Sequence, residues 1–229
     1  MNMACSNSKR MLDWSTVDTV LLDMDGTLLD RHFDDYFWEQ FVPEKYAEKN
    51  YLAFTEARKQ LLAKYKSRQG TLDWTDLDFW SQELELDIPA LKIKVDHLIA
   101  VHPYVVDFLS FCAYKNKKTY LVTNAHSKTL DIKLEKTAIS GYFARIVCSQ
   151  EIGVAKEDPL FWRKLEIMLD FDKKRTLLAD DTEAVLRTAK DFGIAFLFFV
   201  ARPSSRLPTQ YSADFPSIDY FNELFQGDC

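Results

Sequence analysis

The chain has 229 residues, of which 47% are hydrophobic and 28% are charged, and its formal net charge is −6. A chain of this length can bury a substantial core without staples, and its four scattered cysteines argue against a disulfide framework. No long basic run is present, so we expect no nucleic-acid partner. Neither a membrane-length apolar stretch nor an apolar signal segment is found, which favours a cytoplasmic protein.

The first predicted element is a buried strand over residues 19–22, which is β-branched and apolar and ends abruptly at Asp23. Gly26 and Thr27 then break the strand. Residues 33–99 carry aromatic and aliphatic side chains at helical spacing, without a convincing strand among them. This stretch therefore predicts an inserted, all-helical subdomain.

From about residue 103 the pattern changes to helices alternating with short apolar runs. The expected strands cover residues 119–122, 145–148, 176–179 and 194–200. The expected helix caps are Ser127, Asp158 and Thr182. Strands that alternate with helices predict a parallel sheet in an α/β fold. The tail after Pro203 is rich in turns, with a short helix expected near residues 220–225.

Polar residues follow four of the predicted strands, where the carboxyl ends of parallel strands meet at one edge and bind ligands. These residues are Asp23 and Asp25, Thr123 and Asn124, Lys156, and Asp180 and Asp181. Four carboxylates at one place repel each other unless a cation lies among them, and all-oxygen ligands suit Mg²⁺. Backbone N–H groups near Gly26 and Asn124, with the Lys156 ammonium, suit a phosphoryl group. The sequence therefore predicts a site for phosphoryl chemistry.

The string from Asp23 to Asp30, DMDGTLLD, resembles the first motif of the haloacid dehalogenase-like phosphohydrolases. Thr123, Lys156 and the pair from Asp180 resemble their second, third and fourth motifs, in the same order and with matching spacing. The resemblance implies a Rossmann-like, three-layer core made of residues 1–32 and 100–229. It also implies that residues 33–99 form a helical cap over the site.

The resemblance implies a role for each matched residue. Asp23 would attack phosphorus and form an aspartyl-phosphate, and Asp25 would act as general acid and then as general base. The implied catalytic set is Asp23, Asp25, Thr123 and Lys156. The phosphate-binding set is Gly26, Thr27, Thr123, Asn124 and Lys156. The implied Mg²⁺ ligands are Asp23, Asp25 through its main-chain carbonyl, Asp180 and Asp181.

Two details refine the resemblance. Many relatives carry Pro directly after the lysine of the third motif, whereas Lys156 is followed by Glu157 and Asp158 here, so the local turn is expected to differ. Dehalogenases of this fold lack a second aspartate like Asp25, whose presence favours phosphate chemistry.

Several strings resemble bacterial GMP/IMP nucleotidases, and that resemblance implies hydrolysis of purine nucleoside 5′-monophosphates. They include DYFW from Asp35, TNAH from Thr123, KED from Lys156 and DDTEA from Asp180. The alternatives are a sugar-phosphate phosphatase, a phosphoglucomutase-type phosphotransferase and a non-catalytic phosphate-binding scaffold. The scaffold is disfavoured because the whole catalytic set is retained. The sequence does not indicate an oligomeric state.

The helical stretch also carries aromatic residues that are able to stack on a purine. They are Tyr36, Phe37, Trp38, Trp74 and Trp80. Aromatic residues at helical spacing are more often core, so we expect most of these to be buried. Arg31, His32 and His126 lie close to the motifs in the sequence, and they are candidates for contact with the substrate or with the cap hinge.

Overall fold

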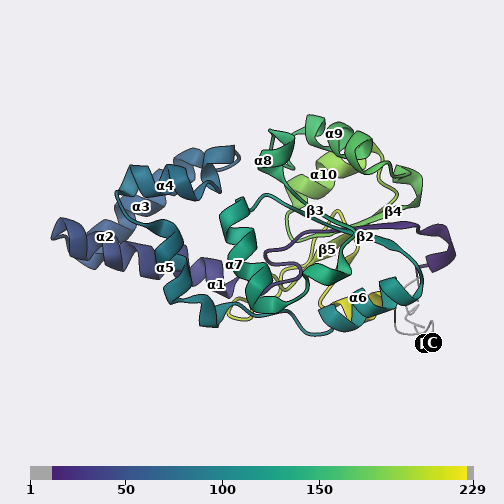
Figure 1. Ribbon diagram of the computed structural model, residues 1–229, viewed down its shortest axis with the longest axis horizontal. Coiled ribbons are helices and arrows are strands. Elements are labelled where there is room, and N and C mark those ends of the chain that lie inside the picture. Colours follow the sequence, from purple (N-terminus) through teal and green to yellow (C-terminus); the bar gives the residue numbers. More distant parts are fainter. Residues whose placement is uncertain (1–11, 226–229) are drawn as a thin grey trace, which may run out of the picture.

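The computed structural model describes residues 12–225 of the chain. Its centre is a parallel sheet of six strands in the order β3-β2-β1-β4-β5-β6 (Figure 1). The strands are β1 (Thr19–Leu22), β2 (Lys118–Thr123), β3 (Arg145–Cys148), β4 (Thr176–Asp180), β5 (Phe196–Val200) and β6 (Ser217–Ile218). The predicted α/β fold with a parallel sheet is confirmed.

Helices cover both faces of the sheet. Val20 and Leu22 of β1 belong to one core cluster, which includes residues of α6 (Val105–Tyr114). Leu21 belongs to a second cluster, which includes residues of α9 (Pro159–Leu169) and α10 (Glu183–Phe192). Successive side chains of a strand point to opposite faces, so β1 is apolar from Val20 to Leu22 because both of its faces are buried. The Rossmann-like, three-layer arrangement follows from this packing.

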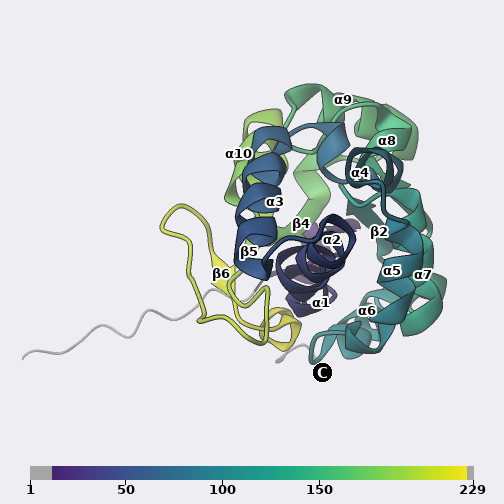
Figure 2. The ribbon, with the colours of Figure 1, turned by 90° about the vertical axis from the view of Figure 1, so that its left-hand side faces the viewer.

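The regular structure between residues 32 and 98 is helical throughout, and we call residues 33–99 the helical segment. Its helices are α1 (His32–Tyr36), a π-helical turn (Phe37–Phe41), α2 (Val42–Asn50), α3 (Phe54–Arg68), α4 (Leu77–Leu84) and α5 (Ile88–Lys94), with short 3-10 turns at Leu72–Trp74 and Asp96–Leu98. The segment projects away from the sheet (Figure 1), and α7 (Ser127–Thr137) of the core lies beside α5 (Figures 1 and 2).

The order of the strands decides where the site forms. β1 pairs with β2 on one side and with β4 on the other, with Leu22 opposite Leu121 and Ala179. Residue 23 therefore emerges at the middle of the carboxyl edge, between the ends of β2 and β4. In open α/β sheets this position, where the chain direction of the crossovers reverses, is where ligands bind.

Several local predictions need correction. Ser127 does not cap α7, because the Nδ1 atom of His126 accepts the Lys128 N–H at 3.2 Å instead. The Thr182 side chain makes no capping bond, and its N–H donates to Asp180 Oδ1 at 2.9 Å. The last long strand begins at Phe196 and not at residue 194. β6 was not predicted, since two residues are too few to show a period.

The end of the described chain forms a 3-10 turn at Phe221–Leu224, near the expected short helix. Cys112 and Cys148 are free thiols, whereas Cys5 and Cys229 lie outside the described residues. The expected lack of a signal segment likewise concerns residues outside the described range. No helix in residues 12–225 has the length and apolar character needed to cross a membrane.

Candidate active site

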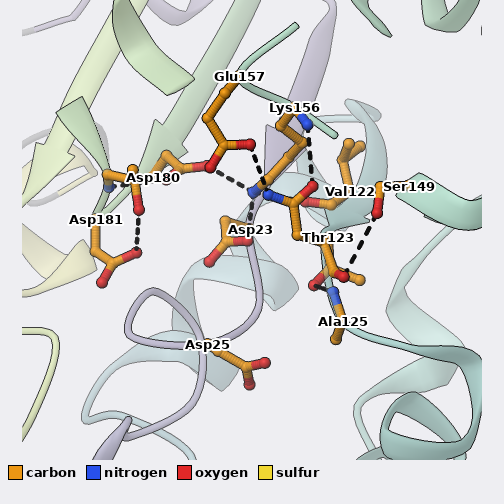
Figure 3. Close-up of polar contacts among 12 residues, drawn as sticks. Asp23, Asp25, Val122, Thr123, Ala125, Ser149, Lys156, Glu157, Asp180 and Asp181 are labelled. Atoms are coloured by element: carbon orange, nitrogen blue, oxygen red, sulfur yellow. Dashed lines mark hydrogen bonds and ion pairs between the residues drawn. The ribbon is translucent and has the colours of Figure 1, made fainter. Parts of the chain in front are cut away.

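Asp23 and Lys156 form a buried ion pair at the centre of the carboxyl edge. Lys156 Nζ contacts Asp23 Oδ1, lies 2.7 Å from Asp180 Oδ2, and also donates to the Val122 carbonyl at 3.3 Å (Figure 3). The side chain of Lys156 is only 3% exposed. A buried ammonium needs such partners, so Lys156 is fixed between the ends of β1 and β4.

The loop that carries Lys156 is held by Asn124 and not by a proline. Asn124 Oδ1 accepts the Lys156 N–H at 3.0 Å, and Asn124 Nδ2 donates to Glu157 Oε2 at 2.9 Å. Trp162 Nε1 donates to the Lys156 carbonyl at 2.9 Å. Asp158 then caps α9 by accepting the Leu160 N–H. The local turn thus brings Lys156 to Asp23 although no proline follows it.

Asp180 and Asp181 bring two more carboxylates to the same place. One oxygen from each of Asp23, Asp180 and Asp181 lies within 4.8 Å of the others. Arg31 Nη1 donates to Asp181 Oδ2 at 2.8 Å and steadies its outer side. The three carboxylates from two strand ends therefore face one small volume.

The charge of this cluster is incompletely balanced by protein cations. Burial raises the pKa of the Asp23 carboxyl to about 6, against the pull of Lys156. Burial also raises the pKa of Asp181 well above its usual range, and the charges of Asp23 and Asp180 add to that rise. A divalent cation would relieve this repulsion, and the all-oxygen donor set suits Mg²⁺. These residues therefore fit the predicted metal.

The Asp25 carboxylate lies apart from this cluster, as Figure 3 shows. Its Oδ1 atom is 2.5 Å from Nζ of Lys133, a residue of α7. Burial raises the pKa of Asp25 to about 6, while Lys133 opposes the rise. The Asp25 side chain thus points away from the three grouped carboxylates, and the use of its main-chain carbonyl as a metal ligand stays a prediction.

Gly26 and Thr27 shape the turn beside the carboxylates. The Gly26 N–H donates to the Leu29 carbonyl at 2.7 Å, and the Thr27 N–H donates to Met24 at 3.4 Å. Gly26 has φ of +86°, and a Cβ atom there would lie 2.4 Å from Asp181 Oδ2. Only glycine fits this approach. Both N–H groups are engaged within the turn, and phosphate binding by these two residues stays a prediction.

Thr123 ends β2 and is buried with its hydroxyl beside the edge. Thr123 Oγ1 accepts the Ala125 N–H at 2.9 Å, which fixes the start of the loop after β2. The structure thus brings together Asp23, Lys156, Asp180 and Asp181, with Thr123 and Asn124 forming the neighbouring wall.

Residues 17–193 match the family of haloacid dehalogenase-like hydrolases. The chain belongs to this family. The hydrolase is also 36% identical to the GMP/IMP nucleotidase YrfG of Escherichia coli K12 over 211 residues, which cover 92% of this chain and 95% of that protein. The family and this relative make the protein an enzyme.

Two solved structures resemble the hydrolase in fold. A HAD phosphatase from Thermococcus onnurineus superposes with a TM-score of 0.77 at 23% identity, covering 91% of this chain and 96% of that one. A putative β-phosphoglucomutase from Thermotoga maritima gives a TM-score of 0.65 at 18% identity, covering 91% and 97% of the two chains. Both likenesses concern the fold alone.

A cavity of about 640 Å³ lies between the sheet edge and the helical segment of the hydrolase. Asp23, Asp25 and Lys156 line its floor, and Trp38 and Trp74 line the part formed by the helical segment. The expectation that most of the five aromatic residues are buried holds for Phe37 and Trp80. Tyr36 and Trp38 are only partly buried, and Trp74 is 37% exposed.

Sequence reasoning missed three charged residues at this cavity: Asp34 and Lys92 line it, and Lys133 lies behind Asp25 and Asp34. Lys92 and Lys133 stand on apolar helix faces, beside Ile88 and Leu130 in the spacing of one turn, and both are buried. A lysine on an apolar helix face is unusual unless it is paired, and this signal was available from the sequence.

Proposed function

We propose that the enzyme hydrolyses purine nucleoside 5′-monophosphates to a nucleoside and inorganic phosphate, with Asp23 as the nucleophile. The observation that carries the proposal is the grouping of Asp23, Lys156 and two further carboxylates at the middle of the carboxyl edge. The choice of substrate draws support from the relative named a GMP/IMP nucleotidase, which matches nearly the whole chain.

In the first step an Asp23 carboxylate oxygen attacks phosphorus, a bond from Asp23 to phosphorus forms, and the ester P–O bond breaks. Protonated Asp25 gives its proton to the leaving 5′-oxygen. Lys156 holds Asp23 in place and offers positive charge to the phosphoryl oxygens as charge builds on them. The nucleoside leaves as the alcohol, and Asp25 becomes a carboxylate.

In the second step water attacks the phosphorus of the aspartyl-phosphate. The Asp25 carboxylate takes a proton from that water, the bond from Asp23 to phosphorus breaks, and inorganic phosphate leaves. Asp25 is protonated again, so the cycle consumes one water and restores both aspartates. The hydroxyl of Thr123 stands beside the same volume and would bind the phosphoryl group.

The residues that would hold Mg²⁺ are Asp23, Asp180 and Asp181, with the Asp25 main-chain carbonyl. When bound, the cation would neutralise charge on the transferring phosphoryl group. Arg31 holds Asp181 from the outside, so the protein fixes this carboxylate before any ligand arrives.

The helical segment would act as a cap that selects the substrate. Trp74 is partly exposed at the cavity, and the Tyr65 hydroxyl is buried without a hydrogen-bond partner among the described residues. An aromatic face and an unpaired hydroxyl suit a purine, which offers a π-surface and ring acceptors. A cap of this kind would also exclude water from the reaction.

The test is inorganic phosphate release from a panel of phosphomonoesters that includes GMP, IMP, AMP, pyrimidine monophosphates and hexose phosphates. We expect GMP and IMP to be preferred, with activity lost on chelation of Mg²⁺. The Asp23→Asn variant should lose roughly 10⁴-fold or more in kcat. Preference for a hexose phosphate would overturn the proposed substrate and leave the proposed reaction in place. Transfer of the phosphoryl group to a second substrate without release of inorganic phosphate would favour a mutase.

A further inference from the structure

The Asp25 carboxylate is held by a buried lysine that does not line the cavity. Lys133 Nζ lies 2.5 Å from Asp25 Oδ1 and also contacts Asp34 Oδ2 of α1. Its side chain is 1% exposed, and Asp25 and Asp34 border the cavity whereas Lys133 does not. Lys133 thus does not face the cavity itself, and its contact with the proposed acid–base group is its ion pair with Asp25.

The contact continues into the helical segment. Asp34 Oδ1 accepts from Lys92 Nζ of α5 at 2.9 Å, and the Lys92 side chain is also 1% exposed. The ring of Phe33 lies 4.8 Å from Lys92 Nζ and 5.2 Å from Lys133 Nζ. Two buried lysines and two partly buried aspartates therefore alternate in a charge-balanced row, with an aromatic ring against both ammonium groups.

Such a row is costly unless each member keeps its partners, because desolvated charges are stable only in good geometry. Lys133 comes from the core helix α7, Asp34 from α1 and Lys92 from α5. One ammonium group therefore joins the Asp25 carboxylate to the helical segment. Displacement of α1 would remove one of the two carboxylates that hold Lys133 in place.

We propose that Lys133 is a positioning residue that holds the Asp25 carboxylate in the orientation needed for acid–base catalysis. Asp34 and Lys92 link that orientation to the packing of the helical segment against the core. The proposal rests on the proposed function, in which Asp25 transfers protons. It assigns Lys133 a role in the transition state of the first step without contact to the substrate.

The test separates proton transfer from structural support by changing the leaving group. A nucleoside 5′-oxygen is a poor leaving group that needs a proton, whereas p-nitrophenolate leaves readily without one. The first-step rate would be measured in single turnovers, as release of nucleoside from GMP and of nitrophenol from p-nitrophenyl phosphate. In Lys133→Met, we expect this rate to fall about 10²-fold or more with GMP. With the nitrophenyl ester the factor by which the rate falls should be at least ten times smaller.

Three variants make the result specific. Lys133→Arg keeps the charge and should restore much of the rate with GMP. Lys136→Met removes a lysine of the same helix that pairs with Asp96 at 3.3 Å, far less buried, and should change neither rate. In an Asp25→Asn background, Lys133→Met should cost nothing further, because Lys133 acts through Asp25.

Equal loss with both leaving groups, or further loss in the Asp25→Asn background, would overturn the proposal. If Lys133→Met does not fold, Lys133→Gln takes its place with the same expectations. If the wild-type enzyme ignores GMP yet cleaves another alkyl phosphate, that ester replaces GMP and only the choice of substrate fails. A folded, Mg²⁺-loaded wild type that cleaves no phosphomonoester would overturn the proposed function and this role with it.

Discussion

At the scale of single residues, the geometry of the site depends on a few close contacts that restrict the positions of its charged side chains. Lys156 is shared by Asp23 and Asp180, Arg31 holds Asp181, and Gly26 leaves room for the Asp181 carboxylate. Each approach joins residues far apart in the sequence. A change of one atom at such a position should therefore alter the site more than the fold.

Gly26→Ala should weaken Mg²⁺ binding. The new Cβ atom would lie 2.4 Å from Asp181 Oδ2 and 2.9 Å from the Pro203 side chain, so Asp181 must move. Titration calorimetry with MgCl₂ should show at least about tenfold weaker affinity, equal to about 1.4 kcal/mol. The backbone strain should also lower the free energy of unfolding by about 1–3 kcal/mol.

Gly70→Ala is the matched control for this prediction. Gly70 has nearly the same φ, +83°, but nothing lies within 4 Å of a Cβ atom there. It should show the strain in urea unfolding and keep the Mg²⁺ affinity. Unchanged affinity in Gly26→Ala would contradict the assignment of Asp181 as a ligand.

The residues of the site could be predicted because they follow strand ends in a recognisable order. Asp23, Lys156 and Asp180 meet as expected, since β1 lies between β2 and β4. The direction of each side chain could not be predicted. Asp25 turns toward Lys133, a partner that depends on how α7 packs, and packing across elements leaves only a faint trace in the sequence.

At the scale of elements, α7 carries most of the charged contacts between core and helical segment. Its lysines Lys128, Lys133 and Lys136 pair with Asp78, Asp34 and Asp96, respectively. The first and last pairs are largely exposed and contribute little to stability. The middle pair, Lys133 and Asp34, is the most buried of the three, so its loss should lower the free energy of unfolding most.

Asp34→Asn should destabilise the protein by about 3–5 kcal/mol near neutral pH, because Lys92 then keeps no carboxylate partner in its buried place. Burial alone would raise the pKa of Asp34, but Lys133 and Lys92 bring it down to about 2, below its ordinary value of 3.8. The stabilisation is therefore complete above 3.8 and is lost as pH falls toward 2.

Urea unfolding of wild type and Asp34→Asn across this pH range measures the effect. The difference in unfolding free energy should shrink steadily as pH falls from 3.8 to 2. Asp96→Asn, which breaks the exposed pair with Lys136, should cost less than about 1 kcal/mol. A difference for Asp34→Asn that stays constant with pH would contradict the ionised pairing.

The helices of the segment were predictable as a group, but their ends were less so. Stripes such as Ala57, Leu61 and Tyr65 are buried as helical spacing indicates. The π-helical turn at Phe37–Phe41 was not expected, because a single wide turn does not change the pattern of apolar residues. Likewise His126, and not Ser127, caps α7, because the His126 ring accepts a hydrogen bond from the Lys128 N–H.

At the scale of the whole molecule, two bodies of different construction enclose one cavity. The sheet edge supplies the charged floor, and the helical segment supplies aromatic walls. The sequence indicates a change of pattern between them, because period-3.6 stripes and strand–helix alternation differ clearly. The division into a core and a cap stays a prediction. The sequence did not indicate which aromatic side chains face inward, since that depends on how the two bodies dock.

Trp74→Ala should raise KM for purine nucleotides about tenfold, because stacking on a base contributes about 1–3 kcal/mol. KM for p-nitrophenyl phosphate should change little, since that ester has no purine. Phe54→Ala is the control: Phe54 is 39% exposed, close to the 37% of Trp74, but borders a different hollow. Equal changes in KM for both esters would argue against a base-binding role for Trp74.

The proposed reaction requires a covalent phosphoryl group on Asp23. The direct measurement is peptide mass mapping after an acid quench during turnover of GMP with Mg²⁺. We expect one added phosphoryl group on the peptide that contains Asp23, and none in the Asp23→Asn variant. Hydrolysis that proceeds at full rate in Asp23→Asn, or a phosphoryl group found on a different residue, would contradict it.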